Sequence, residues 1–203
     1  MSLSLFQRIL IQAVLLSVQS LLYFGCEKFQ KNFHDVHRDI DDQIPLDPRW
    51  VWVYILWFPL IAIAPLSFYH GKGALLDIYL ISIVLDIISS VVFYMLYPTT
   101  FERPEVPDTF SGRVLKMVYK GSYRGVNCMP SMHCSQCMIL LITILADREL
   151  PLVLAVVYGG IALGIIYSTQ ATKQHVLVDF LMAIPQSILC FLFGYGIHML
   201  IGG

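Results

Sequence analysis

The stretch STQATKQHVLVD, from Ser168 to Asp179, is a polar island in a chain that is otherwise strongly apolar. Within it, His175 and Asp179 are spaced i, i+4, so on a helix both side chains lie on one face within hydrogen-bonding reach. A carboxylate behind an imidazole fixes the ring tautomer and leaves the other ring nitrogen free to act as a nucleophile or a base. Lys173 adds a cation two residues earlier. The alternative is a structural polar pair that anchors a helix end at a membrane surface.

A second histidine lies in NCMPSMHC, residues 127–134. Pro130 suits the first turn of a helix, where its missing N–H group costs nothing, so Ser131 and His133 are expected in that turn. Backbone amides at a helix N-terminus bind phosphate oxygens. The alternative is a helix start with an incidental interfacial histidine.

A third polar cluster is YPTTFERPEVP, residues 97–107, whose prolines end a helix. Arg103 in this cluster can pair with an oxyanion through two hydrogen bonds. Taken together, two histidines, a carboxylate and several cations at helix ends indicate a phosphate site with a nucleophile and a general acid. No dense group of Asp, Glu and His offers ligands for two metal ions, so metal-independent chemistry without a cofactor is expected.

The elements that position these residues are those of a membrane protein. The chain has 203 residues, of which 57% are hydrophobic and 13% charged, and a soluble domain of this size cannot bury so much apolar surface. A net charge of −1 gives no indication of a nucleic-acid partner. We expect one all-α domain over 1–203, a polytopic bundle of six transmembrane helices in the lipid bilayer. The predicted spans are 5–25, 50–69, 74–97, 129–146, 151–168 and 177–201.

Six crossings place both chain termini on one side of the membrane, together with the tight turns 70–73 and 146–150. The three longer connectors, 26–49, 98–128 and 169–176, then share the other side. Each of the polar clusters described above belongs to one of these connectors or to a helix end beside it. The sequence therefore predicts that they converge on one membrane face.

Other polar residues have simpler interpretations. Cys134 and Cys137 form a CxxC beside His133, but no second cysteine pair follows, so small hydrophobic side chains that face lipid or another helix are expected rather than metal ligands. Asp86, in the third span, is a functional candidate because a carboxylate in the bilayer is costly, but an interhelical hydrogen bond is expected. The first connector is expected to be a solvated loop with five acidic residues: Asp35, Asp39, Asp41, Asp42 and Asp47.

The three clusters resemble the three motifs of the type-2 phosphatidic acid phosphatase superfamily, which are Lys-x6-Arg-Pro, Pro-Ser-Gly-His and Ser-Arg-x5-His-x3-Asp. Here they read Arg103-Pro104, then Pro130-Ser131-Met132-His133, then Ser168-Thr169-x5-His175-x3-Asp179. The resemblance covers about residues 95–180, and the spacing of the third motif is fully kept. Residues 41–59 are also similar to the bacterial branch that resembles inositol phosphorylceramide synthases. The resemblance implies six transmembrane helices.

Three positions depart from these motifs. Leu96 stands in place of the lysine, Met132 in place of the glycine, and Thr169 in place of the second arginine. Two phosphate-binding cations are therefore missing, and Lys173 is well placed to replace one of them. The candidates for the other lie in the second connector: Lys116, Lys120 and Arg124.

The resemblance also implies the role of each residue. His175 would attack phosphorus and form a phosphohistidine, with Asp179 orienting its ring. His133 would protonate the leaving oxygen as the general acid. Helix-end amides and three side chains would stabilise the developing charge: Arg103, Ser131 and Lys173.

The expected function is that of an integral-membrane lipid phosphate phosphatase, acting on a phosphatidate, phosphatidylglycerophosphate or polyprenyl phosphate type of lipid. A second possibility is a phosphotransferase that moves a phosphoryl-alcohol headgroup to a lipid alcohol. A third is a non-catalytic membrane protein, such as a transporter or a degenerate binding member of the family. The missing cations at Leu96 and Thr169 are the best support for this possibility.

Two arguments predict opposite orientations of the chain in the membrane. Ten lysines and arginines lie on the side of the histidines and three on the other side, and the positive-inside rule would place the histidines in the cytoplasm. The family resemblance implies a site that faces outward from a bacterial cytoplasmic membrane. Several of these cations would be functional, so we follow the resemblance.

Overall fold

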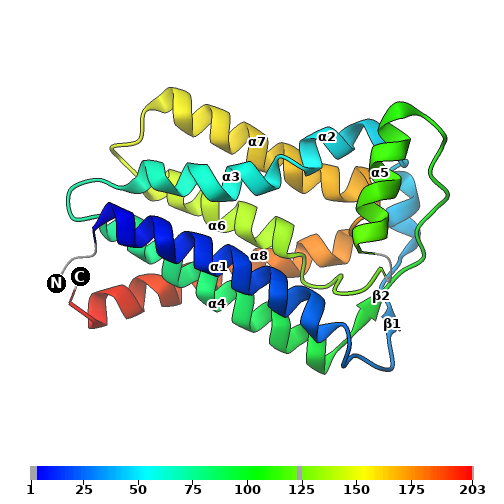
Figure 1. Ribbon diagram of the computed structural model, residues 1–203, viewed down its shortest axis with the longest axis horizontal. Coiled ribbons are helices and arrows are strands. Elements are labelled where there is room, and N and C mark those ends of the chain that lie inside the picture. The colour runs from blue at the N-terminus through cyan, green and yellow to red at the C-terminus, as the bar shows by residue number, and fades with distance from the viewer. Residues whose placement is uncertain (1–3, 123–124, 203) are drawn as a thin grey trace.

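The computed structural model describes residues 4–122 and 125–202, and it is 71% helix and 3% strand. Its longer helices run side by side along the long axis, and a short helix, loops and strands lie at one end (Figure 1). The helices are α1 (Leu5–Cys26), α2 (Val51–Tyr54), α3 (Trp57–Ile63), α4 (Ala74–Leu96), α5 (Phe110–Gly121), α6 (Met132–Ala146), α7 (Leu152–Ala171) and α8 (Leu177–Leu200). The strands are β1 (His34–Asp35) and β2 (Thr99–Thr100), and short 3₁₀ helices cover Asp39–Gln43, Pro48–Trp50 and Ala64–Phe68.

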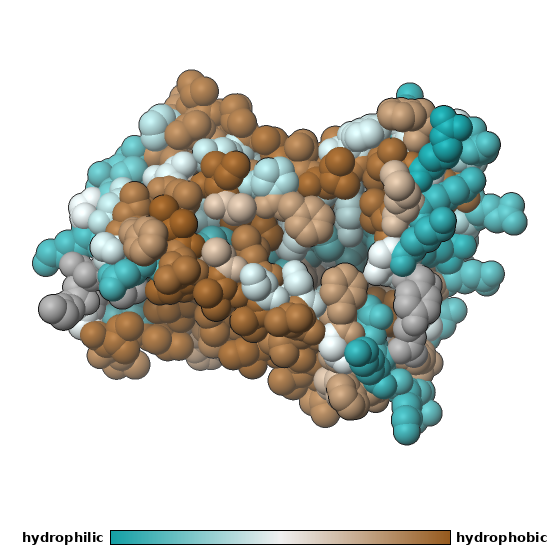
Figure 2. Space-filling model, in the orientation of Figure 1, coloured by the Kyte–Doolittle hydropathy of each residue, from teal (hydrophilic) through white to brown (hydrophobic). Residues whose placement is uncertain are grey.

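Within the described residues, five segments are long and apolar enough to cross a membrane: Leu5–Cys26, Pro48–Phe68, Ala74–Leu96, Leu152–Ala171 and Leu177–Leu200. The apolar helix α6 is shorter, since its 15 residues extend about 22 Å, against about 30 Å for a bilayer core. These six segments agree with the predicted spans to within three residues at each end. Figure 2 shows the result as an apolar band between two more hydrophilic ends. The structure is therefore all-helical and compatible with an integral membrane protein of six crossings.

Helix α6 lies at the centre of the bundle, where it packs against α4, α7 and α8. Its Cys134 and Cys137 are fully buried in the main hydrophobic core. The interpretation of the CxxC as small hydrophobic side chains that face another helix is confirmed. In the same interior, Gln186 of α8 donates from Nε2 to Oδ1 of Asp86 at 2.7 Å, which confirms the expected interhelical hydrogen bond.

Helix α1 turns its polar side chains toward the bundle. Arg8 is buried and donates to both carboxylate oxygens of Asp77 in α4, from Nε at 2.7 Å and from Nη2 at 2.6 Å. Gln12 donates to the carbonyl oxygen of Ile61 at 2.6 Å. The Gln19 amide oxygen accepts from Nε2 of Gln136 in α6 at 2.8 Å. The polar residues that weaken the hydropathy of the first span are thus its contacts with later helices.

The three long connectors meet at the end of the bundle opposite the termini, as predicted (Figure 1). Strands β1 and β2 pair in parallel, with His34 opposite Thr99, and so join the first connector to the second. Nη2 of Arg103 donates to the Gln174 amide oxygen at 3.0 Å, which joins the second connector to the third. Nζ of Lys173 donates to the Asp41 carbonyl oxygen at 2.6 Å, which joins the third to the first.

Two features of these connectors were not expected. The second connector contains the amphipathic helix α5, which lies across the open end of the bundle and buries Leu115. The third connector is shorter than predicted, because α7 continues through Ser168 and ends only at Ala171. In both cases polar residues that were expected in a loop are helical.

Candidate active site

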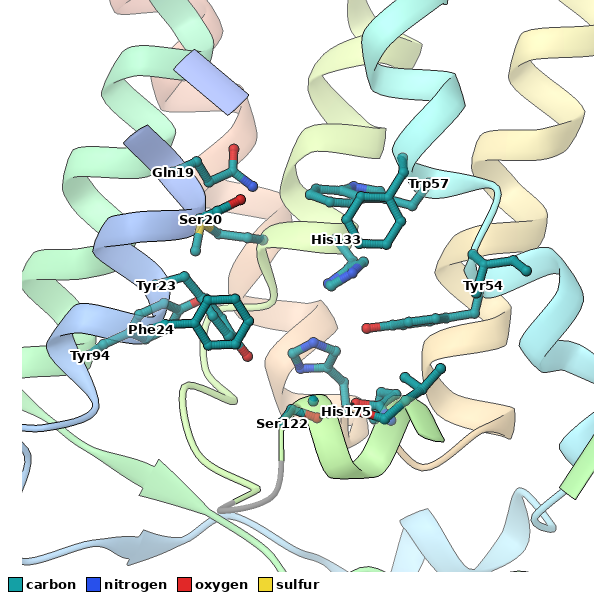
Figure 3. A pocket seen from close by; sticks show the side chains of 16 residues that line it. Gln19, Ser20, Tyr23, Phe24, Tyr54, Trp57, Tyr94, Ser122, His133 and His175 are labelled. Carbon is teal, nitrogen blue, oxygen red and sulfur yellow. Dashed lines mark hydrogen bonds between the residues drawn. The ribbon is translucent and has the colours of Figure 1, made fainter. Parts of the chain in front are cut away.

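Both histidines of the sequence motifs line one cavity of about 270 Å³, the histidine cavity. In Figure 3 the rings of His133 and His175 lie between two groups of side chains, those of α1 on one side and Tyr54 and Trp57 on the other. The span over Pro48–Phe68 is divided into α2 and α3, which brings these two aromatic rings to the cavity wall. The cavity is therefore built where one span is broken and another, α6, begins late.

The loop before α6 descends into the protein and sets the depth of His133. Residues 125–131 are buried, and hydrogen bonds from other elements hold their backbone. The Tyr94 hydroxyl donates to the Pro130 carbonyl oxygen at 2.7 Å, and the Met129 amide donates to Oγ1 of Thr99 at 3.0 Å. Backbone that is not helical is tolerated at membrane depth when protein surrounds it in this way.

Helix α6 begins later than the sequence indicated. Pro130 was expected in the first turn, but it lies one residue before the N-cap, Ser131. The Ser131 hydroxyl accepts from the Cys134 amide at 3.3 Å, which ends the loop and starts the helix there. His133 is in the first turn, as predicted.

The ring of His133 lies between two aromatic rings. Its centroid is 4.7 Å from that of Tyr54, at an interplanar angle of 28°, and 4.4 Å from that of Trp57, at 42°. The centroid of the His175 ring is 5.8 Å away. The two aromatic rings fix the plane of the His133 ring in the cavity wall.

The predicted pair of His175 and Asp179 is confirmed. Nδ1 of His175 lies 3.1 Å from Oδ2 of Asp179 and 3.0 Å from the carbonyl oxygen of Cys128. A carbonyl oxygen only accepts hydrogen bonds, so Nδ1 carries the proton and Nε2 keeps its lone pair. The Cys128 carbonyl was not predicted, because the fold alone brings it to a histidine 47 residues later.

The turn before His175 is fixed by its own backbone. The Thr169 carbonyl oxygen accepts from the amides of Gln174 and His175, at 3.0 and 3.1 Å, and Lys173 adopts a left-handed conformation with φ of 52°. The Tyr119 hydroxyl donates to the Thr172 carbonyl oxygen at 2.7 Å. Burial raises the pKa of Tyr119 to about 12, so this donor keeps its proton at neutral pH.

Four of the cations that were predicted to bind phosphate lie outside the histidine cavity. Arg103 and Lys173 both line a second cavity of about 560 Å³, the outer cavity, on the side of the loops. Burial lowers the pKa of Lys173. Its Nζ donates to the Asp41 carbonyl oxygen. Lys116 and Lys120 are on the exposed side of α5. Direct contact of these four residues with a substrate stays a prediction.

Two other residues of the predicted phosphate site have different placements. Arg124 lies outside the described residues. Ser131 is fully buried as the cap of α6, and it is not among the residues that line the histidine cavity. The position of the missing motif arginine, Thr169, is also fully buried, and its hydroxyl donates to the Ile166 carbonyl oxygen at 2.8 Å.

The first connector is not simply a solvated loop, because Asp41 is buried. Its Oδ1 accepts from the Leu177 amide at 2.7 Å, and its Oδ2 accepts from the Arg38 amide at 2.9 Å. Asp179 accepts from the next free amide, that of Val176, at 3.0 Å. These carboxylates accept from the backbone amides at the start of α8. Fewer amides are therefore left at that helix end to bind a phosphate than the sequence indicated.

Replacement of Asp41 by alanine is expected to destabilise the protein by about 1–2 kcal/mol, because α8 loses its N-terminal acceptor. Thermal unfolding of the purified protein in detergent measures the effect as a lower Tm. The matched control is Asp42→Ala, which removes a neighbouring exposed carboxylate that lies 3.0 Å from Nε2 of His37. An equal loss of Tm in both variants would show that the cap is not the cause.

Among the residues described, no group of three or more His, Cys, Asp or Glu side chains is placed to hold a metal ion. The chain matches no protein-family model, no curated protein and no solved structure.

Proposed function

We propose that this protein is an integral-membrane lipid phosphate phosphatase that works through a phosphohistidine at His175. The observation that carries the proposal is one cavity lined by two histidines, each held by different neighbours. His175 is oriented by Asp179 and the Cys128 carbonyl, with Nε2 free for attack. His133 lies opposite, with its ring held between Tyr54 and Trp57 and its centroid 5.8 Å from that of His175.

The proposed reaction has two steps. Nε2 of His175 attacks phosphorus, the bond from phosphorus to the lipid oxygen breaks, and His133 gives its proton to that oxygen. Asp179 stabilises the imidazolium character that develops on His175. His133 then takes a proton from water as the water attacks phosphorus, the bond to Nε2 breaks, and phosphate is released. Each histidine returns to its starting state.

The walls of the histidine cavity support a lipid substrate. Besides the histidines they are mostly aromatic and apolar, and they include Phe24 of α1 and Phe58 of α3. The side chains of these two residues are 51% and 59% exposed, so the wall continues into the apolar outer surface of the helices. A lipid could keep its chains in the bilayer while its phosphate reaches the histidines. With α6 as the sixth crossing, the chain would have both termini on one side.

A phosphotransferase is the second candidate, and one observation favours it. Within residues 4–122 and 125–202, no lysine or arginine lines the histidine cavity. A phosphodiester carries one negative charge and a phosphomonoester up to two, so a site with few cations suits a diester donor better. The enzyme would then hold a phosphoalcohol group on His175 and pass it to a lipid alcohol.

Turnover of a panel of lipids by the purified protein in EDTA tests this proposal. Phosphatidate, phosphatidylglycerophosphate and polyprenyl phosphate would be supplied, with free phosphate and headgroup exchange measured separately. Free phosphate is the expected product. Exchanged lipid without free phosphate would show a transferase instead, and no product in either assay would favour a non-catalytic protein. In intact bacteria, turnover of an impermeant short-chain substrate from outside is expected if the site faces outward.

A further inference from the structure

The wall of the histidine cavity contains two buried N–H donors that have no hydrogen-bond partner among the described residues. They are Nε2 of Gln174 and Nε1 of Trp57. The two residues are only 5% and 6% exposed. Buried donors are almost always satisfied in proteins, and leaving one unpaired costs free energy. Because both residues line the cavity, a ligand bound there is the candidate acceptor for these donors.

The amide of Gln174 is held in one orientation. Its oxygen accepts from Nη2 of Arg103 at 3.0 Å and from the Ser122 hydroxyl at 3.3 Å. Because a guanidinium only donates, the amide atom that faces Arg103 must be the oxygen, and the nitrogen is the atom left without a partner. Gln174 directly precedes His175, so this nitrogen is carried on the same turn as the proposed nucleophile.

Arg103 in turn is held behind Gln174. Its Nη1 donates to the Ser122 carbonyl oxygen at 2.8 Å, and its guanidinium lies 4.6 Å from the centroid of the Tyr119 ring. The charge of Arg103 is therefore directed to the oxygen of Gln174. A cation on that oxygen polarises the amide and makes its N–H groups stronger donors.

We propose that Gln174 donates from Nε2 to a phosphoryl oxygen of the substrate, with Trp57 as a second donor, and that Arg103 acts as a positioning residue through Gln174. This inference rests on the proposed function and refines it. A polarised amide would take the place of the arginine that the motif lacks at Thr169. The donors are neutral, so they discriminate less between one and two charges on the phosphate than a pair of cations would.

Orthovanadate binding to the purified protein in detergent, measured by calorimetry, tests the inference. Gln174→Glu keeps the oxygen that Arg103 and Ser122 hold but replaces the donor, and Gln174→Met removes the donor without adding charge. Both are expected to weaken vanadate binding at least 10-fold and to lower kcat/KM by about 10²-fold. Gln12→Met, a buried amide lost at the other end of the bundle, is the control and should leave both values unchanged.

The role of Arg103 is tested by a double-mutant cycle on vanadate binding. If Arg103 acts through Gln174, Arg103→Met with Gln174→Met binds no more weakly than Gln174→Met alone. Additive losses would mean that Arg103 contacts the ligand itself, and would overturn that part of the inference. Wild-type binding with no loss in either Gln174 variant would overturn the inference but not the phosphatase. Failure of the wild-type protein to bind vanadate would overturn both.

Discussion

Replacement of His175 by alanine is expected to abolish phosphate release, with a fall of at least about 10⁴-fold in kcat. The variant removes the only proposed nucleophile, and water then has to attack the phosphate directly. Brief incubation with ³²P-labelled lipid followed by a quench at high pH should trap a phosphohistidine in the wild-type protein and none in the variant.

A matched control for His175→Ala is available on the same helix. His198 is also a buried histidine of α8, but it lies near the C-terminal end of that helix. His198→Ala should retain both the activity and the labelled intermediate. Phosphate release that survives in His175→Ala would rule out the covalent mechanism, and labelling lost in both variants would point to a folding defect.

Replacement of His133 by phenylalanine is expected to slow turnover by an amount that depends on the leaving group. Phenylalanine keeps an aromatic ring between Tyr54 and Trp57 but carries no proton to donate. A lipid alkoxide needs that proton, so its first-turnover rate should fall about 10²–10⁴-fold. A nitrophenolate leaves without protonation, so the first-turnover rate with nitrophenyl phosphate should change little.

Rapid-quench measurement of the first turnover separates the two roles proposed for His133. The variant should release a burst of nitrophenol and then stall, because the second step also lacks its general base. Equal losses on the lipid and on the nitrophenyl substrate would contradict the assignment of His133 as the acid. The pH dependence of the first turnover on the lipid gives an independent check, since the limb that reports the general acid should be present in the wild type and absent in the variant.

The parts of this structure that could be predicted from sequence depend on short-range patterns. Apolar length was enough to find the six hydrophobic segments, and the i, i+4 spacing was enough to pair His175 with Asp179. Counting the six crossings was enough to predict that the three long connectors lie at one end of the bundle. Each of these inferences uses only neighbouring residues or the thickness of a bilayer.

The parts that could not be predicted depend on contacts between distant segments. The left-handed turn at Lys173 directs its side chain to Asp41, 132 residues earlier, and so away from the cavity where a replacement cation was expected. Gln174 carries no motif signature, and its orientation comes from Arg103, 71 residues before it. The sequence signal that could have indicated Gln174 is its position next to the proposed nucleophile.

The polar side chains of α1 have a consequence for how the chain is made. Their partners are synthesised later, and the amide of Gln136 that reaches Gln19 is 117 residues further along the chain. Until those helices have entered the bilayer, the first helix carries an unneutralised arginine and two glutamines among lipids, which is costly. Helix α1 therefore cannot complete its packing until α6 has been made, because Gln136 lies 117 residues beyond Gln19.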